Sequence, residues 1–178
     1  MNTFKTKDLD LIPYSPKDLL ALVEGVAAFR GTFGFEAADG LREFLLGPEV
    51  SPGYIDMLRT STASDVWRHG FAMVDREANL VVGNCAFVGP PNETGEVEIA
   101  YGVVPAFEGR GYATQAAAAL TKFAFDDERV QTVIAHTLPE ENASTNILKK
   151  NGFTFAREFD HPEDGTIWRW EKSRGLVQ

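Results

Sequence analysis

The spacing of apolar residues divides the chain into an amino-terminal helical part and a strand-rich part that begins near Val66. A short apolar run in residues 6–13 predicts a first strand. Ser15 followed by Pro16 is typical of a helix start, and the next apolar residues fall on one helical face: Leu19, Leu20, Leu22, Val23 and Val26. Residues 27–60 are rich in phenylalanine and interrupted by glycine and proline, which predicts a cap of short helices.

Beyond Val66 the apolar residues alternate as in strands, in three segments joined by short turns: residues 67–74, 80–88 and 96–104. Short connections of this kind predict neighbouring antiparallel strands. Residues 109–125 carry alanines at helical spacing and lead to another strand at residues 130–138. Because a helix connects them, this strand and the strand at 96–104 should pair in parallel. Asn142 then predicts the N-cap of a helix ending at Lys150, and residues 153–159 and 166–171 predict a closing hairpin.

The composition fits one soluble globular domain and narrows the classes of partner. The chain has 178 residues, of which 44% are hydrophobic and 24% are charged, and its net charge is −9. A surface of that charge disfavours nucleic acid and anionic membranes as partners. The single cysteine, Cys85, excludes an intrachain disulfide, and the three histidines lack metal-ligand spacing. We therefore expect a cytoplasmic protein without a metal, either a monomer or a homodimer.

The segment best suited to holding a ligand is the turn at residues 108–114, Glu-Gly-Arg-Gly-Tyr-Ala-Thr, between a strand and a helix. Closely spaced glycines at a helix start leave backbone N–H groups free, and the helix dipole adds positive potential there. The turn therefore predicts a phosphate site. A dinucleotide-binding fingerprint fits poorly because Thr114 stands in its last place, and a P-loop would require a Gly-Lys-Ser/Thr sequence that the turn lacks.

This turn resembles the pyrophosphate loop of the GNAT superfamily of acetyl-CoA-dependent N-acetyltransferases, Gln/Arg-x-x-Gly-x-Gly/Ala. Gly111 and Ala113 match, and Glu108 replaces the usual first residue, so we expect its side chain to point away from the phosphates. Asn142-Ala143-Ser144 with residues 148–153 resembles the second signature of the family, in the form of the branch that acetylates ribosomal-protein N-termini. The resemblance implies a single-domain α/β fold with a mixed, mostly antiparallel sheet, splayed centrally, and helices on both faces. Residues 1–178 would form this one domain, with residues 97–153 as the acetyl-CoA-binding core and residues 27–60 shaping the acceptor site.

The resemblance also implies that acetyl-CoA is the acetyl donor and that no metal takes part. Backbone groups of two strand residues would pair with pantetheine, amides of the turn would hold the pyrophosphate, and a basic side chain, Arg110, Lys149 or Lys150, would meet the 3′-phosphate. The expected cofactor-binding residues are Val103, Val104, Gly109, Arg110, Gly111, Tyr112, Ala113, Thr114, Asn142 and Lys149.

The implied reaction is direct attack of a primary amine, on a peptide N-terminus or a small molecule, on the acetyl carbonyl. An alkylammonium with a pKa of about 10 must first lose a proton, and Glu98 is the candidate base, acting through a water if the distance is long. Leu148 stands where many relatives carry a tyrosine that protonates the leaving thiolate, so we expect Ser144 or water to take that role, with Asn142 nearby. Two alternatives stay open: a non-catalytic acyl-CoA-binding or sensing module on the same fold, and a dinucleotide-binding enzyme.

Overall fold

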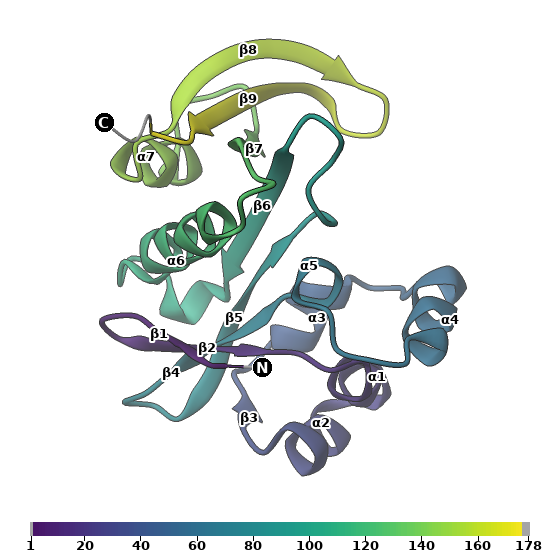
Figure 1. Cartoon of the computed structure of the whole chain (residues 1–178). Coiled ribbons are helices and arrows are strands. Elements are labelled where there is room, and N and C mark those ends of the chain that lie inside the picture. The colour runs from purple at the N-terminus through teal and green to yellow at the C-terminus, as the bar shows by residue number, and fades with distance from the viewer. Residues whose placement is uncertain (1, 176–178) are drawn as a thin grey trace.

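Nine strands form one mixed sheet in the computed structural model, which describes residues 2–175 (Figure 1). The sheet order is β1-β2-β4-β5-β6-β7-β9-β8, with β3 paired to β5. The strands are β1 (Phe4–Lys5), β2 (Leu9–Pro13), β3 (Glu36–Ala37), β4 (Phe71–Asp75), β5 (Leu80–Phe87), β6 (Glu96–Val103), β7 (Thr132–Thr137), β8 (Thr154–His161) and β9 (Gly165–Ser173). The helices are α1 (Pro16–Glu24), α2 (Val26–Phe33), α3 (Leu41–Leu46), α4 (Pro52–Thr60), α5 (Val66–His69), η1 (Pro105–Phe107, a 3₁₀ turn), α6 (Tyr112–Asp126) and α7 (Ala143–Lys150).

The sheet is mostly antiparallel, as the short connections predicted. Strands β4, β5 and β6 are antiparallel neighbours, and so are β8 and β9 of the closing hairpin. Strands β6 and β7 are joined by α6 and pair in parallel, over Glu96–Glu98 and Thr132–Ile134. Both strands continue past this short ladder, to Val103 and Thr137, so the ladder ends and the sheet divides between them.

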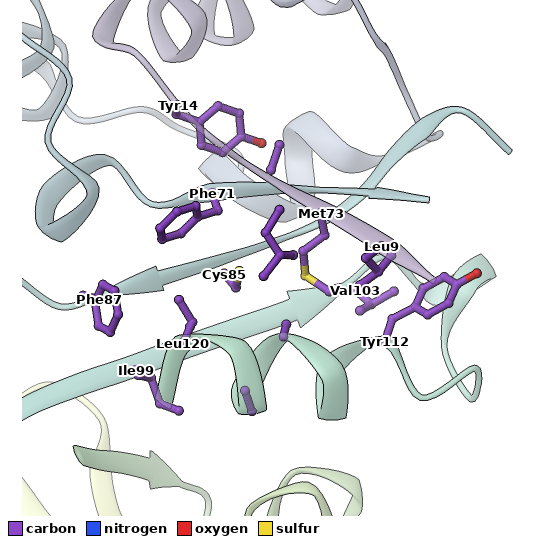
Figure 2. Close-up of a cluster of buried hydrophobic side chains, with 14 of the residues drawn as sticks. Leu9, Tyr14, Phe71, Met73, Cys85, Phe87, Ile99, Val103, Tyr112 and Leu120 are labelled. Carbon is purple, nitrogen blue, oxygen red and sulfur yellow. The ribbon is translucent and has the colours of Figure 1, made fainter. Parts of the chain in front are cut away.

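Helices cover both faces of the sheet, as expected. Figure 1 shows α6 and α7 on one side and α1 to α4 on the other. Trp67 of α5 packs against Phe123 of α6, with 5.3 Å between the ring centres. Figure 2 shows Ile99 and Val103 of β6, Cys85 of β5 and Leu120 of α6 within one buried apolar cluster beside α6. On the opposite face, an added Cβ at Gly102 would lie 2.5 Å from the Cζ atom of Phe44 in α3.

The amino-terminal helices follow the predicted capping but differ in their boundaries. Ser15 caps α1: its hydroxyl accepts from the N–H of Asp18, whose carboxylate accepts from the N–H of Ser15. Val26 does not continue the apolar face of this helix, because α1 ends at Gly25 and Val26 begins α2 with 53% of its surface exposed. Strand β3, of two residues, has no sequence signal of its own.

Two predicted strands are shorter than expected. The strand predicted for residues 6–13 begins only at Leu9, as β2, because the hydroxyl of Thr6 forms two hydrogen bonds with the backbone of Leu9. The strand predicted from residue 67 begins only at Phe71, since Asp65 caps a helical turn by accepting from the N–H of Trp67. Gly70, at φ +71°, ends that turn. An N-cap and a left-handed glycine therefore override the strand preference of the tryptophan.

A buried hydrogen bond ties the start of α6 to β4. The hydroxyl of Tyr112 donates to the carboxylate of Asp75 at 2.7 Å, and both side chains are buried. Burial alone would raise the pKa of Asp75, but the hydrogen bonds from Tyr112 and from the N–H groups of Ala78 and Glu77 outweigh it and lower the pKa below its ordinary value of 3.8.

Tyr112→Phe is expected to destabilise the fold by about 1–3 kcal/mol near neutral pH, because it removes a donor from a buried carboxylate. The folded pKa of Asp75 is the lower one, so its contribution is complete above 3.8 and is lost as the pH falls through the folded value. Urea unfolding at several pH values tests this expectation. An equal loss of stability at neutral and at strongly acidic pH would contradict it.

None of the helices within residues 2–175 is long and apolar enough to cross a membrane.

Candidate active site

The division of the sheet between β6 and β7 adjoins a cavity of about 580 Å³. Its walls come from the end of β6, the turn that follows, the start of α6 and one face of α7, with one residue of α3. The lining residues are Phe44, Tyr101, Gly102, Val103, Phe107, Glu108, Gly109, Gly111, Tyr112, Ala113, Thr114, Ala143, Ser144, Asn146, Ile147 and Lys150. The glycine turn and the second signature, about thirty residues apart, thus face one space.

Backbone hydrogen bonds show which residues of β6 turn their polar groups toward the gap. The N–H of Val88 donates to the carbonyl of Glu98, and the N–H of Val104 donates to the carbonyl of Val82, each at 2.9 Å and each on the β5 side. Successive residues of a strand direct their N–H and C=O groups to opposite edges. The odd-numbered residues 99–103 therefore direct theirs away from β5, into the gap.

The two predicted pantetheine contacts differ in this respect. Val103 lines the cavity and turns its backbone groups toward the gap. Val104 is fully buried, and both of its polar backbone groups are occupied, since its carbonyl also accepts from the N–H of Phe107 at 2.9 Å. The structure therefore brings Val103 to the site but not Val104.

The glycine turn has the backbone geometry of an anion site. Gly109 and Gly111 have φ values of +74° and +78°, and an added Cβ would meet nothing within 4 Å at either position. Glycine is therefore required for conformation and not for space. Gly111 is the N-cap of α6 and provides no side-chain cap, so the N–H groups of the first helical turn lack an intrahelical partner.

The side chains of the glycine turn differ in whether they contribute to the cavity wall. The guanidinium of Arg110 lies 4.6 Å from the ring centre of Phe107, and Arg110 is not among the lining residues. Glu108, expected to point away, is exposed and contributes to the wall. The hydroxyl of Tyr112 is taken up by Asp75, so its contribution to the cavity is the helix start itself.

Helix α7 divides its predicted residues between the cavity and the outer surface. Ser144 lines the cavity, whereas Asn142 serves as the N-cap: its side chain accepts from the N–H of Thr145 at 3.1 Å. Lys149 lies outside the lining, with its Nζ 2.6 Å from Glu141. Lys150, which was weighed with Lys149 at the sequence level, is the lysine of this helix on the cavity wall.

Glu98 lies where β6 and β7 separate, as the last residue of β6 paired with β7. It is outside the lining residues, and its Oε1 is 2.9 Å from Nδ1 of His136. Glu98 and Gly102 are four residues apart on one strand and therefore share a face, the one that Phe44 covers. In the sequence, His136 is noted only as a histidine without metal-ligand spacing, and no short motif predicts that it contacts Glu98.

Two further lining residues were not singled out from the sequence. By strand alternation, Tyr101 lies on the same face of β6 as Ile99 and Val103, the face that α6 covers. This alternation could have been read from the sequence. Phe44 lies in the cap that was expected to shape the acceptor site, but it was not named individually. It is 46% exposed, and its ring occupies the space above Gly102.

The residues present fit an extended anionic thioester such as acetyl-CoA. A strand edge with free amide groups suits pantetheine, a helix start suits its pyrophosphate, and Lys150 adds a positive charge at the wall. Among residues 2–175, no group of three or more His, Cys, Asp or Glu side chains is arranged to hold a metal ion.

The chain belongs to the acetyltransferase (GNAT) domain family, which it matches over residues 9–154. It is 28% identical over 107 residues to the uncharacterized N-acetyltransferase p20 of Bacillus licheniformis, a match that covers 60% of this chain and 56% of that relative. The chain therefore matches little more than half of the length of that curated relative.

Solved structures confirm the fold. The ribosomal-protein-S5-alanine acetyltransferase of Vibrio fischeri superposes with a TM-score of 0.69, 12% identity and full coverage of both chains. RimL, a ribosomal L7/L12 alpha-N-protein acetyltransferase in complex with coenzyme A, superposes with a TM-score of 0.67 and 12% identity, covering 97% of this chain and 98% of that one. At such identities the likeness concerns the fold alone.

Proposed function

We propose that this protein transfers the acetyl group of acetyl-CoA to a primary amine. The observation that carries the proposal is the cavity at the division of β6 and β7, lined on one side by a free strand edge and on another by the uncapped start of α6. Membership of the acetyltransferase family supports the reaction, and RimL, which has the same fold, is in complex with coenzyme A.

In this proposal the chain binds acetyl-CoA largely through its backbone. Val103 pairs with pantetheine, and the N–H groups of residues 109–114 hold the pyrophosphate. Of the three basic residues considered for the 3′-phosphate, Arg110, Lys149 and Lys150, it is Lys150 that takes this role, since it alone lines the cavity. The thioester carbonyl lies at the gap, where the odd-numbered residues of β6 offer N–H groups to the developing oxyanion.

The amine approaches from the cap side of the sheet. Glu98 lies on that face at the point where the strands separate, and it takes the proton of the ammonium through a bridging water, since it lies outside the lining residues. Residues 27–60 shape the acceptor site, with Phe44 as their contribution to the wall. The relatives named for ribosomal proteins make a peptide N-terminus one acceptor class, beside small-molecule amines.

The proposal is tested by combining a binding measurement with a turnover measurement. Acetyl-CoA at about a hundred times its Kd should stabilise the fold by about 2.7 kcal/mol, measured by thermal unfolding. A panel of peptides and small amines is then assayed for release of free thiol from acetyl-CoA. Stabilisation without amine-dependent thiol release would favour a non-catalytic acyl-CoA-binding module, and stabilisation by NAD alone would favour a dinucleotide-binding protein.

A further inference from the structure

A second cavity lies apart from the candidate active site, between α7 and the closing hairpin of β8 and β9. Its volume is about 480 Å³, in the range of pockets that hold small molecules. Its lining residues, called the aromatic cavity below, are Glu141, Lys149, Phe153, Thr154, Phe155, Trp168 and Trp170. The two cavities share no lining residue among residues 2–175. The acetyl transfer proposed above therefore leaves the aromatic cavity unused.

Three aromatic rings meet at steep angles in this cavity. The ring of Phe155 stands at 72° to that of Trp168 and at 75° to that of Trp170, with ring centres 5.4 and 5.9 Å apart. Trp170 is buried and its indole N–H donates to the hydroxyl of Thr137, whereas Phe155 is 51% exposed. Rings at such angles enclose a corner, and the negative faces of aromatic rings attract cations.

One cation of the protein itself already lies in this corner. The Nζ atom of Lys149 is 5.8 Å from the ring centre of Trp170 and 2.6 Å from a carboxylate oxygen of Glu141. The hydrogen bond from Lys149 lowers the pKa of Glu141 below its ordinary value of 4.5, so the carboxylate is charged at neutral pH. An aromatic face and a carboxylate are thus placed together around an ammonium group.

Lys149 can leave this position at little cost. Its side chain and that of Glu141 are 47% and 61% exposed, and ion pairs at such exposure contribute little stability, because water and salt compete with them. The ammonium of lysine is compact and strongly hydrated, whereas quaternary ammonium groups are the cations that aromatic cages select. The net charge of −9 adds a general attraction for cations.

We propose that the aromatic cavity is a second binding site, which takes a small organic cation with an alkylated ammonium group in place of Lys149. The ammonium of the ligand lies against the three rings, and Glu141 balances its charge. A quaternary nitrogen has no lone pair and cannot be acetylated, which separates this ligand from the amine acceptor. The inference does not depend on the function proposed above.

Choline and its neutral carbon isostere, 3,3-dimethylbutanol, test the proposal on the full chain. Because the two molecules have nearly the same shape, we expect choline to bind about five- to thirtyfold more tightly, measured by NMR titration of the ligand methyl resonance. An excess of acetyl-CoA should leave the Kd of choline unchanged. Equal affinities for the two molecules would indicate a neutral apolar pocket, and competition by acetyl-CoA would place choline in the first cavity. Either result, or no binding of choline, would overturn the proposal.

Substitutions locate the bound cation. Lys149→Met keeps the length of the side chain and removes the competing charge, so choline should bind about two- to fivefold more tightly. Phe155→Leu changes an exposed wall residue and should weaken choline binding about fivefold. Lys122→Met is the matched control, because Lys122 is also a helical lysine in an exposed ion pair, 3.2 Å from Asp126, but lies outside the cavity. The control should leave the Kd of choline unchanged.

The direction of the lysine effect distinguishes displacement from packing. If Lys149 only supported the cavity wall, its replacement would weaken choline binding. A Lys149→Met variant that binds choline no more tightly than the wild type would therefore overturn the proposal. A Phe155→Leu variant with the affinity of the wild type would do the same, and so would an equal gain of affinity in Lys122→Met and Lys149→Met.

Discussion

Glu98→Gln is expected to lower kcat by about 10² to 10⁴-fold while acetyl-CoA still binds with unchanged affinity. Glutamine keeps the size of the side chain and a hydrogen bond to His136, but it cannot accept a proton from the acceptor ammonium. The effect should be largest at low pH, where the amine is fully protonated and depends most on a base. Steady-state kinetics across pH, with calorimetry for acetyl-CoA, measure both quantities.

Glu96→Gln is the matched control for this substitution. Glu96 lies two residues earlier on the same face of β6 but is held in an ion pair with Arg169. Its replacement should leave kcat within a few-fold of the wild type, even where it lowers thermal stability. Equal losses of kcat in the two variants would assign the effect to the strand and not to proton transfer by Glu98. An unchanged pH–rate profile in Glu98→Gln would remove Glu98 as the base.

Gly111→Val is expected to weaken acetyl-CoA binding by at least tenfold, or about 1.4 kcal/mol. Gly111 has a φ of +78°, and a β-branched residue there is strained by about 1–3 kcal/mol. Relief of that strain turns the N–H groups at the start of α6 away from the cavity. The side chain meets no protein atom, since an added Cβ has open space within 4 Å, so the loss would come from backbone conformation.

The β8–β9 turn supplies a control of the same geometry. Gly165 has a φ of +73°, also has open space around an added Cβ, and lies outside the cavity. Gly165→Val should therefore lower the melting temperature to a similar degree while leaving the Kd of acetyl-CoA within twofold. If both variants lost affinity equally, general destabilisation would explain the effect. If neither lost affinity, the glycine turn would not be the phosphate site.

Local signals in the sequence predicted most of the fold. The cap at Ser15 and the closing hairpin, which rest on residues close in sequence, are confirmed. The parallel pairing of β6 with β7 is confirmed too, because the helix that connects the two strands was readable from local spacing. Trp67 was misassigned to a strand because its preference was read without the cap at Asp65. Strand β3 depends on pairing with β5, which no local pattern encodes.

The sequence predicted the parts of the site that the backbone forms. Glycine spacing pointed to the turn at residues 108–114 and the second signature pointed to Ser144, and both line the same cavity. The positions of side chains were harder to predict from the sequence. Successive residues of a helix point about 100° apart. Lys150 therefore lines the cavity, whereas Lys149 pairs with Glu141 outside it. The Glu98–His136 pair joins residues 38 apart and depends on the register of two strands, so it emerged only with the structure.

The cavity wall comes from two segments, residues 101–114 and 143–150, with Phe44 as the single contribution from the amino-terminal cap. Under the proposed function, donor binding and acceptor choice would therefore depend on separate parts of the chain. Substitutions among residues 27–60 can accumulate without disturbing the donor side, provided that core residues such as Phe29 and Leu41 are kept. If the proposed function holds, this arrangement would let acceptor preference diverge in evolution, or be exchanged by transplanting the cap, while the donor stays the same.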